Sequence, residues 1–165
     1  MKKLFFLISL FLFLPTLIFT QVIYSPRIDS IINLVSPSIM TRLDKELSGD
    51  TMTMISGLPY RIYSRWYNSP SNQQAAQYIL EKFQGYGLPA RFQYNNSHNV
   101  NVIARKTGSV SPHLKIVISA HYDNILSGTV MPYDTVYGAD DNASGVVAVL
   151  EAARLLANYN SPYTI

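Results

Sequence analysis

Apolar residues recur at helical spacing in three parts of the chain. Residues 23–47 carry apolar side chains at steps of three and four, and Pro37 divides this pattern into two short helices. Residues 71–86 repeat the pattern, with Ser71 placed to cap the helix and a Gln three positions later, as in a capping box. Residues 144–158 are apolar over most of a helix circumference, so we expect this helix to pack closely against a sheet.

Four other segments have the pattern of β-strands. Residues 91–94 are a short candidate, and residues 99–105 alternate between apolar and polar side chains. Residues 114–120 are almost continuously apolar and rich in β-branched side chains, which predicts a central strand buried on both faces. Residues 163–165 resemble the start of a further strand.

The first twenty residues have the layout of a secretory signal peptide. A basic head is followed by an apolar run from Leu4 to Leu14, which Pro15 interrupts. The alternative is an uncleaved membrane anchor, but the run is shorter than the roughly 20 residues that a spanning helix needs. We therefore expect cleavage of residues 1–20 and a secreted or periplasmic protein, without stable membrane association afterwards.

Charge and composition exclude several classes of function. The chain has 13 Lys and Arg against 10 Asp and Glu, and without Lys2 and Lys3 the balance is 11 against 10, a net charge of +1. Such a neutral chain gives no electrostatic reason to expect a nucleic acid as partner. There is no cysteine, so disulfides, cysteine nucleophiles and cysteine-bound zinc are excluded, and any metal must use His, Asp or Glu.

His121-Tyr122-Asp123 follows the apolar run of residues 114–120 directly. Alternation along a strand sends His121 and Asp123 to one side and Tyr122 to the other. In open α/β sheets, ligands bind in the crevice outside the carboxyl ends of the strands. One strand end is therefore expected to offer an imidazole together with a carboxylate that can orient the imidazole ring.

A second polar segment, Asp140-Asp141-Asn142, stands directly before the last helix. Two adjacent carboxylates are unfavourable unless a cation neutralises them. Imidazole and carboxylate ligands without thiolate fit Zn²⁺, Mn²⁺ or Co²⁺. An ordinary helix cap or Asx-turn is the alternative interpretation, and residues 142–144 also match the glycosylation sequon.

The combined pattern is more specific than its parts. Residues 118–123 (ISAHYD) and 138–156 (GADDNASGVVAVLEAARLL) resemble the zinc aminopeptidases of the co-catalytic metallopeptidase clan, peptidase family twenty-eight. The resemblance extends more loosely upstream and covers roughly the last hundred residues. It implies an α/β fold, a three-layer αβα sandwich around a mixed sheet (the phosphorylase/hydrolase-like zinc exopeptidase fold), here incomplete at the carboxyl end.

The resemblance also implies a division of the chain and roles for individual residues. After the signal peptide, residues 21–70 would form a helical and irregular segment, and residues 71–165 the truncated first part of the peptidase domain. His121 resembles the ligand of one zinc ion, Asp141 the carboxylate that bridges two zinc ions, and Asp123 the carboxylate behind the histidine. These three residues are the predicted site.

Further details of the site follow from the same resemblance. The matching Asp–Asn peptide is typically cis in the family, so a cis bond is expected between Asp141 and Asn142, and Asp140 is expected to point away from the metals. The general base of the family, a Glu in a Glu-Glu pair, and three further ligands lie on segments that would follow Ile165. Glu151 is unsuited to replace that base because it lies in mid-helix.

The function implied is that of an exported di-zinc aminopeptidase with a peptide as substrate, of which this chain is an inactive fragment. Two alternatives are a peptidase-like binding or adhesion domain without catalysis and a glutaminyl-cyclase-like acyltransferase. Tyr133 and Tyr137 are candidates for lining the substrate pocket, with ordinary loop packing as the alternative. His98 and His113 are expected to be merely solvated.

Overall fold

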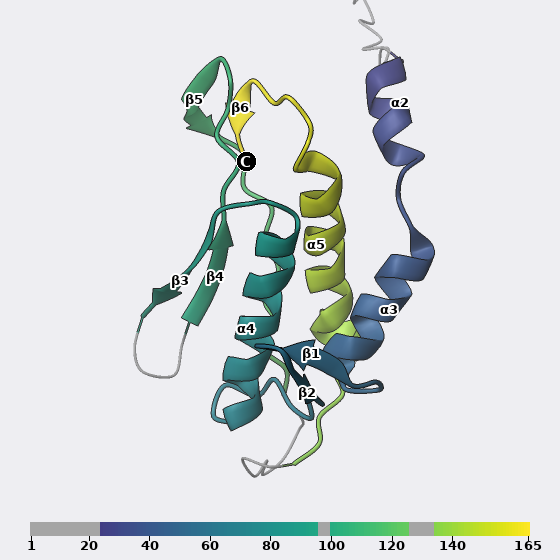
Figure 1. Cartoon of the computed structure of the whole chain (residues 1–165), viewed down its shortest axis with the longest axis vertical. Helices are drawn as coiled ribbons and strands as arrows, with labels where there is room; N and C mark the ends of the chain where they lie inside the picture. Colours follow the sequence, from purple (N-terminus) through teal and green to yellow (C-terminus); the bar gives the residue numbers. More distant parts are fainter. Residues whose placement is uncertain (1–23, 96–99, 126–133) are drawn as a thin grey trace, which may run out of the picture.

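The computed structural model describes residues 24–95, 100–125 and 134–165. The proposed signal peptide, His98 and Tyr133 lie outside the described residues. Within the described ranges, no helix combines the length and the apolar character that crossing a membrane would require. The elements, drawn in Figure 1, are α2 (Pro26–Ile32), α3 (Pro37–Ser48), β1 (Thr53–Ile55), β2 (Leu58–Tyr60), α4 (Pro70–Gly85), β3 (Ala90–Tyr94), β4 (Val100–Ala104), β5 (Ser111–Lys115), the helical turn η1 (Ala139–Ala143), α5 (Ser144–Leu156) and β6 (Tyr163–Thr164).

The helices form where the periodic segments predicted them, with one correction at a cap. Pro37 is the first residue of α3, so it separates α2 from α3 as expected. The predicted cap of α4 is wrong: Ser69 is the N-cap, and its Oγ accepts a hydrogen bond from the Ser71 N–H at 3.3 Å. Pro70 explains the shift, because its fixed φ and missing N–H suit the first helical position. Ser71 lies buried in the first turn.

The strands of the described residues form three two-stranded sheets. β1 pairs with β2, and β3 pairs with β4; both pairs are antiparallel. β5 and β6 are parallel, so residues 163–165 do begin a strand. The protein is thus mixed α/β over its described residues, and the three-layer sandwich stays a prediction.

The expected central strand over residues 114–120 is wrong in extent and in burial. β5 ends at Lys115, and the side chains of Ile116, Val117 and Ile118 are 48%, 81% and 45% exposed. In the described part of the chain, no strand pairs with residues 117–120. The β-branched composition predicts an extended backbone, but burial on both faces requires neighbouring strands, and the described residues supply none there.

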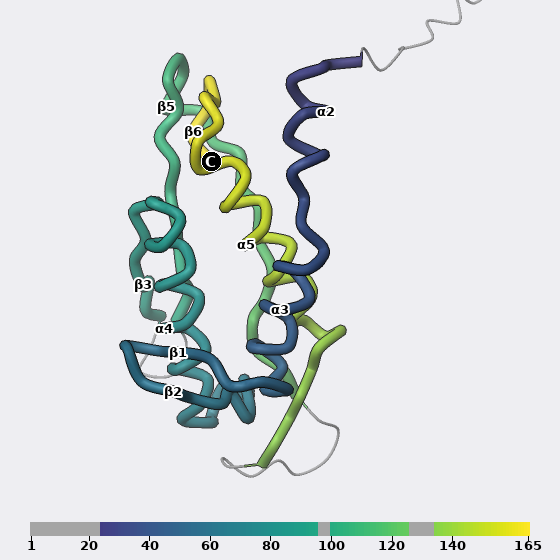
Figure 2. Tube along the Cα trace, turned by 45° about the vertical axis from the view of Figure 1, so that its right-hand side comes forward, coloured from purple at the N-terminus to yellow at the C-terminus, as the bar shows by residue number. Residues whose placement is uncertain are grey.

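The core lies where α3, α4 and α5 meet. In Figures 1 and 2, α5 runs between α4 and α3, and both of these helices contact it. Leu43 and Leu47 of α3, Tyr78 of α4 and Leu150 of α5 are fully buried members of one apolar cluster. This cluster fixes the amino-terminal end of α5, the helix that begins directly after the Asp140-Asp141-Asn142 segment.

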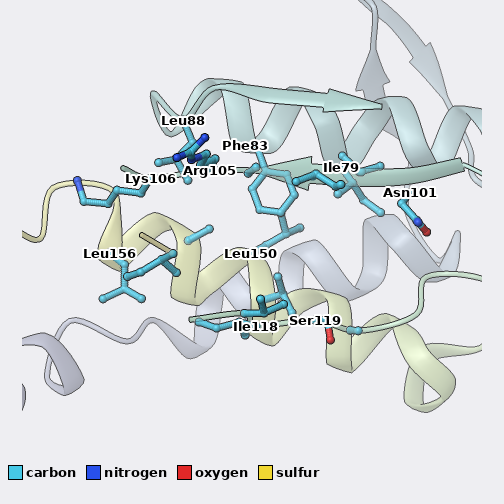
Figure 3. A pocket seen from close by; sticks show the side chains of 18 of the residues that line it. Ile79, Phe83, Leu88, Asn101, Arg105, Lys106, Ile118, Ser119, Leu150 and Leu156 are labelled. Carbon is cyan, nitrogen blue, oxygen red and sulfur yellow. The ribbon is translucent and has the colours of Figure 1, made fainter. Parts of the chain in front are cut away.

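An apolar groove of about 690 Å³ lies between β4 and residues 116–120. Phe83 of α4 and Leu150 of α5 line it, and Ile118 lies along its other wall (Figure 3). The carboxyl end of the chain also borders it, through Thr164 and Ile165. The groove therefore lies along the side of residues 116–120 where no described strand pairs with them.

Candidate metal centre

His121 lies between two carboxylates. Its Nδ1 is 3.2 Å from Asp123 Oδ1, and its Nε2 is 3.3 Å from Asp141 Oδ1. The side chains of His121, Asp123 and Asp141 are 56%, 58% and 81% exposed, so all three are accessible from solvent. The structure thus brings together the three residues of the predicted site, although they come from two segments of the chain.

Tyr122 lies on the opposite side of this segment from its two neighbours, as alternation predicts. Its hydroxyl lies 3.2 Å from Asn72 Oδ1 and 3.0 Å from Val100 O, so these two acceptors share its single proton. Burial, followed by the charge of Asp123, raises the pKa of Tyr122 to about 12, so the phenol stays protonated and keeps donating. The inward tyrosine therefore anchors the segment and leaves His121 and Asp123 facing outward.

The side chain of Asn142 joins the segment that carries His121 to the start of α5. Its Nδ2 donates to the His121 carbonyl at 3.2 Å, and its Oδ1 accepts from the Gly145 N–H at 3.2 Å. A Cβ on Gly145 would lie 2.3 Å from Asn142 Oδ1, so only glycine leaves room for this amide. The Asp141–Asn142 peptide is cis, as the family resemblance implied.

Gly138 gives the preceding loop its tight turn. Its φ is +54°, and a Cβ there would lie 2.6 Å from Asp141 O and 2.8 Å from Asn124 Cβ. A side chain at this position would be strained in its backbone conformation and would collide with both segments. Glycine therefore allows the loop to pass close to Asn124 and to deliver Asp141 to His121.

Arg65 is the residue near the site that the sequence analysis missed. It is fully buried, and its guanidinium donates to the carbonyls of Leu47, Tyr122, Tyr137 and Gly138. Burial lowers its pKa to about 10, against the opposing charges of Asp44, Asp123 and Asp141, so it remains charged at neutral pH. Nothing in the local pattern separates this buried arginine from the exposed ones, because its partners are distant in sequence.

Asp140 and Asp141 have different surroundings, as expected. Asp141 Oδ1 lies 3.3 Å from His121 Nε2. The charge of Asp140 acts instead on Asp44, whose pKa is raised first by burial, against the effect of Arg65, and then by Asp140. Among the two adjacent carboxylates, only Asp141 therefore faces the imidazole.

The donors fit part of a zinc site. A histidine nitrogen and a carboxylate oxygen, both exposed and facing each other across 3.3 Å, are typical zinc ligands. A zinc site needs at least three protein ligands, and the described residues contain no group of three or more His, Cys, Asp or Glu that could hold a metal ion. His121 and Asp141 could therefore supply two ligands of a zinc site, and further ligands would be needed to complete it.

An open hollow of about 770 Å³ lies beside His121, bordered by Asn142 and Gly145. Tyr137 is exposed and does not line this hollow, which favours ordinary loop placement over a role in a substrate pocket. Glu151 is engaged elsewhere: it accepts from the Ser36 N–H and from Arg154. His113 is exposed on β5, as expected for a solvated histidine.

Comparison with known proteins identifies relatives of the chain. A probable zinc metalloprotease of Pyrenophora tritici-repentis is 32% identical over 101 residues, covering 61% of this chain and 20% of that protein. A probable leucine aminopeptidase of Arthroderma otae is 30% identical over 129 residues, covering 74% and 32%. The uncharacterized protein YfbL of Escherichia coli is 32% identical over 162 residues, covering 94% and 46%. The chain thus spans less than half the length of each of these relatives.

A solved structure agrees on the fold. The crystal structure of LapB from Legionella pneumophila superposes with a TM-score of 0.62 at 22% identity, over 87% of this chain and 37% of that one. The family comparison is more specific, because residues 101–165 match the profile of Peptidase family M28. His121, Asp123 and Asp141 all lie inside this match. The segment of residues 101–165 therefore belongs to peptidase family M28.

Proposed function

We propose that this chain is the amino-terminal part of an exported di-zinc metallopeptidase, an aminopeptidase that releases amino-terminal residues from peptides. The observation that carries the proposal is the 3.3 Å approach of His121 Nε2 to Asp141 Oδ1 within the segment matched by family M28. Relatives named as zinc metalloprotease and leucine aminopeptidase support the same class. A metal-free binding domain is less well supported, because the imidazole and both carboxylates are retained in one place.

Each residue of the site has a role in this proposal. His121 would bind one zinc ion through Nε2, and Asp141 would share its carboxylate between two ions. Asp123, 3.2 Å from His121 Nδ1, would hold the ring in the tautomer that leaves Nε2 free for the metal. Bound zinc would supply Lewis-acid activation of water and of the scissile carbonyl, lowering the pKa of the water to ~7.

The general base and the remaining ligands would come from polypeptide that continues beyond Ile165. The apolar groove supports this. The N–H of Ile165 donates to the Lys106 carbonyl at 2.9 Å, the N–H of Lys106 donates to the Ile165 carbonyl at 2.8 Å, and the N–H of Ile116 donates to the Thr164 carbonyl at 2.8 Å. The last residues thus lie between the end of β4 and the start of residues 116–120, at the position marked C in Figure 1. A strand continuing from Ile165 would enter the groove and cover both of its walls.

An activity comparison tests the proposal. The 165-residue chain and a version extended by the coding sequence downstream would be purified and supplied with zinc and an aminoacyl chromogenic substrate. We expect turnover by the extended protein alone, and its loss in the His121→Ala and Asp141→Ala variants. Robust turnover by the 165-residue chain would refute the need for further residues, and turnover by the alanine variants would refute the assignment of the ligands.

Export is part of the same proposal and rests on the pattern of residues 1–20. A fusion of these residues to an alkaline phosphatase that lacks its own leader tests it, because that enzyme is active only after export. We expect phosphatase activity outside the cytoplasm and a mature chain that begins near residue 21. An inactive, uncleaved fusion would refute export and leave the peptidase assignment intact.

A further inference from the structure

We propose that Arg65 is a positioning residue, and that with Asn124 it forms a buried brace that sets the separation of His121 and Asp141. The inference rests on the zinc-binding role proposed above. It extends that role to a residue that neither touches the proposed ligands nor lies in the segment matched by family M28.

The guanidinium of Arg65 connects three segments of the chain. Its Nε donates to Tyr122 O at 2.7 Å, between the two outward-facing residues of the site. Its Nη2 donates to Gly138 O at 2.6 Å, and its Nη1 donates to Tyr137 O at 3.0 Å, just before Asp141. Nη1 also donates to the carbonyl of Leu47, the penultimate residue of α3, at 2.5 Å. One side chain thus holds both ligand-bearing segments against the helical core.

The backbone of Arg65 reinforces the same connection. Its N–H donates to Asn124 Oδ1 at 2.9 Å, while Asn124 Nδ2 donates to Val136 O at 2.7 Å. Its carbonyl accepts from Asn72 Nδ2 at 2.6 Å, which ties residue 65 to the first turn of α4. Asn124 therefore acts beside the guanidinium, linking the end of one ligand segment to the approach of the other.

The brace matters because the two proposed ligands are far apart along the chain. A ligand that is displaced by a fraction of an ångström no longer fits the coordination geometry of the metal. The residues that orient metal ligands typically contribute a factor of about 10–100 in metal affinity. The guanidinium is a planar, rigid fork with five N–H donors, so it fixes the relative positions of the carbonyls that it bonds. A lysine ammonium has three donors and would leave some of these buried carbonyls unpaired.

The charge of Arg65 makes the positioning role distinguishable from an electrostatic one. A buried cation near the site repels a zinc ion, so removing only the charge would favour zinc binding. Removing the brace would instead weaken zinc binding, because His121 and Asp141 would no longer be held together. Arg65→Met removes both the charge and the bonds, whereas Arg65→Lys keeps the charge and loses part of the fork.

The experiment is a zinc titration of the purified 165-residue chain, followed through the imidazole nitrogen and carbon resonances of His121 by NMR. Wild type is expected to bind weakly with a clear response of His121. Arg65→Lys and Arg65→Met are each expected to bind zinc at least about tenfold more weakly than wild type. Arg154→Lys is the matched control. Arg154 also donates to a backbone carbonyl, Leu34 O at 2.8 Å, but it lies in the last turn of α5, away from the site. The zinc affinity of this variant should equal that of wild type.

The outcomes separate this inference from the proposed function. Wild-type affinity in a folded Arg65→Lys, or tighter binding in Arg65→Met, would overturn the brace while zinc binding itself stands. If both Arg65 variants fail to fold, Asn124→Ala decides, since it removes only the bonds to Arg65 N and Val136 O; unchanged affinity there would also overturn the brace. No response of His121 in the wild type would overturn the zinc proposal and the brace together.

Discussion

Gly145 leaves no room for a side chain, and replacing it with alanine has a calculable effect. The new Cβ would lie 2.3 Å from Asn142 Oδ1 and 2.7 Å from its Cγ and Nδ2. Real contacts of a Cβ are longer than about 3 Å, so the amide of Asn142 must move by more than half an ångström. That movement breaks the bonds to the His121 carbonyl and to the residue 145 N–H, both 3.2 Å long.

The magnitude follows from two opposing effects. Two hydrogen bonds are worth about 1 kcal/mol each, so their loss costs about 2 kcal/mol. Alanine in place of glycine within a helix stabilises the folded state by up to about 1 kcal/mol. We therefore expect Gly145→Ala to lower the free energy of unfolding by about 1 kcal/mol, measured by urea denaturation followed with circular dichroism.

Gly85→Ala is the matched control, because Gly85 is the last residue of α4 and a Cβ there meets nothing within 4 Å. It should raise the free energy of unfolding by about 0.5–1 kcal/mol, as a glycine-to-alanine change in a helix does without a clash. Equal stabilisation by both substitutions would refute the idea that the Asn142 amide fills the space beside Gly145.

Three further predictions concern stability and association. Glu151→Gln should make unfolding less sensitive to acid. Hydrogen bonds from Arg154 lower the pKa of Glu151, so the stabilisation that the carboxylate provides is present above pH 4.5 and is lost as the pH falls below that value. An unchanged pH dependence of urea denaturation would contradict this. Tyr78→Phe should lower the free energy of unfolding by about 2 kcal/mol, because the phenol donates to the carboxylate of Glu46 in the core. An unaltered thermal midpoint would contradict this prediction. Val117→Lys should reduce self-association in light scattering, because an exposed apolar edge promotes it; equal scattering would contradict that.

Local patterns predicted what depends on neighbours in sequence. Periodicity located α3, α4 and α5, and the strand-then-helix motif placed His121, Asp123 and Asp141 in one site before their distances were known. The N-cap of α4 is Ser69 and not the predicted Ser71, because Pro70 prefers the first helical position.

Features that depend on distant partners could not be predicted in the same way. Residues 114–120 have the composition of a buried strand, but their burial is decided by what lies beside them. Arg65 carries no local sign of its burial, since its four carbonyl partners belong to residues 18 to 73 positions away. The candidate metal ligands form a motif that the sequence shows, whereas the contacts that position them are not visible in it.

The contacts of Arg65 also affect where this protein can be divided. A boundary at residue 70 looks natural on the sequence, because α4 begins there after an irregular stretch. Truncation at that point would remove the guanidinium and leave the carbonyls of Tyr122, Tyr137 and Gly138 inside the protein with their donor gone. The segment before residue 70 therefore cannot be removed without affecting the site. If it were exchanged for the matching segment of a relative, the site would be preserved only if the new segment carried an arginine at the position of Arg65.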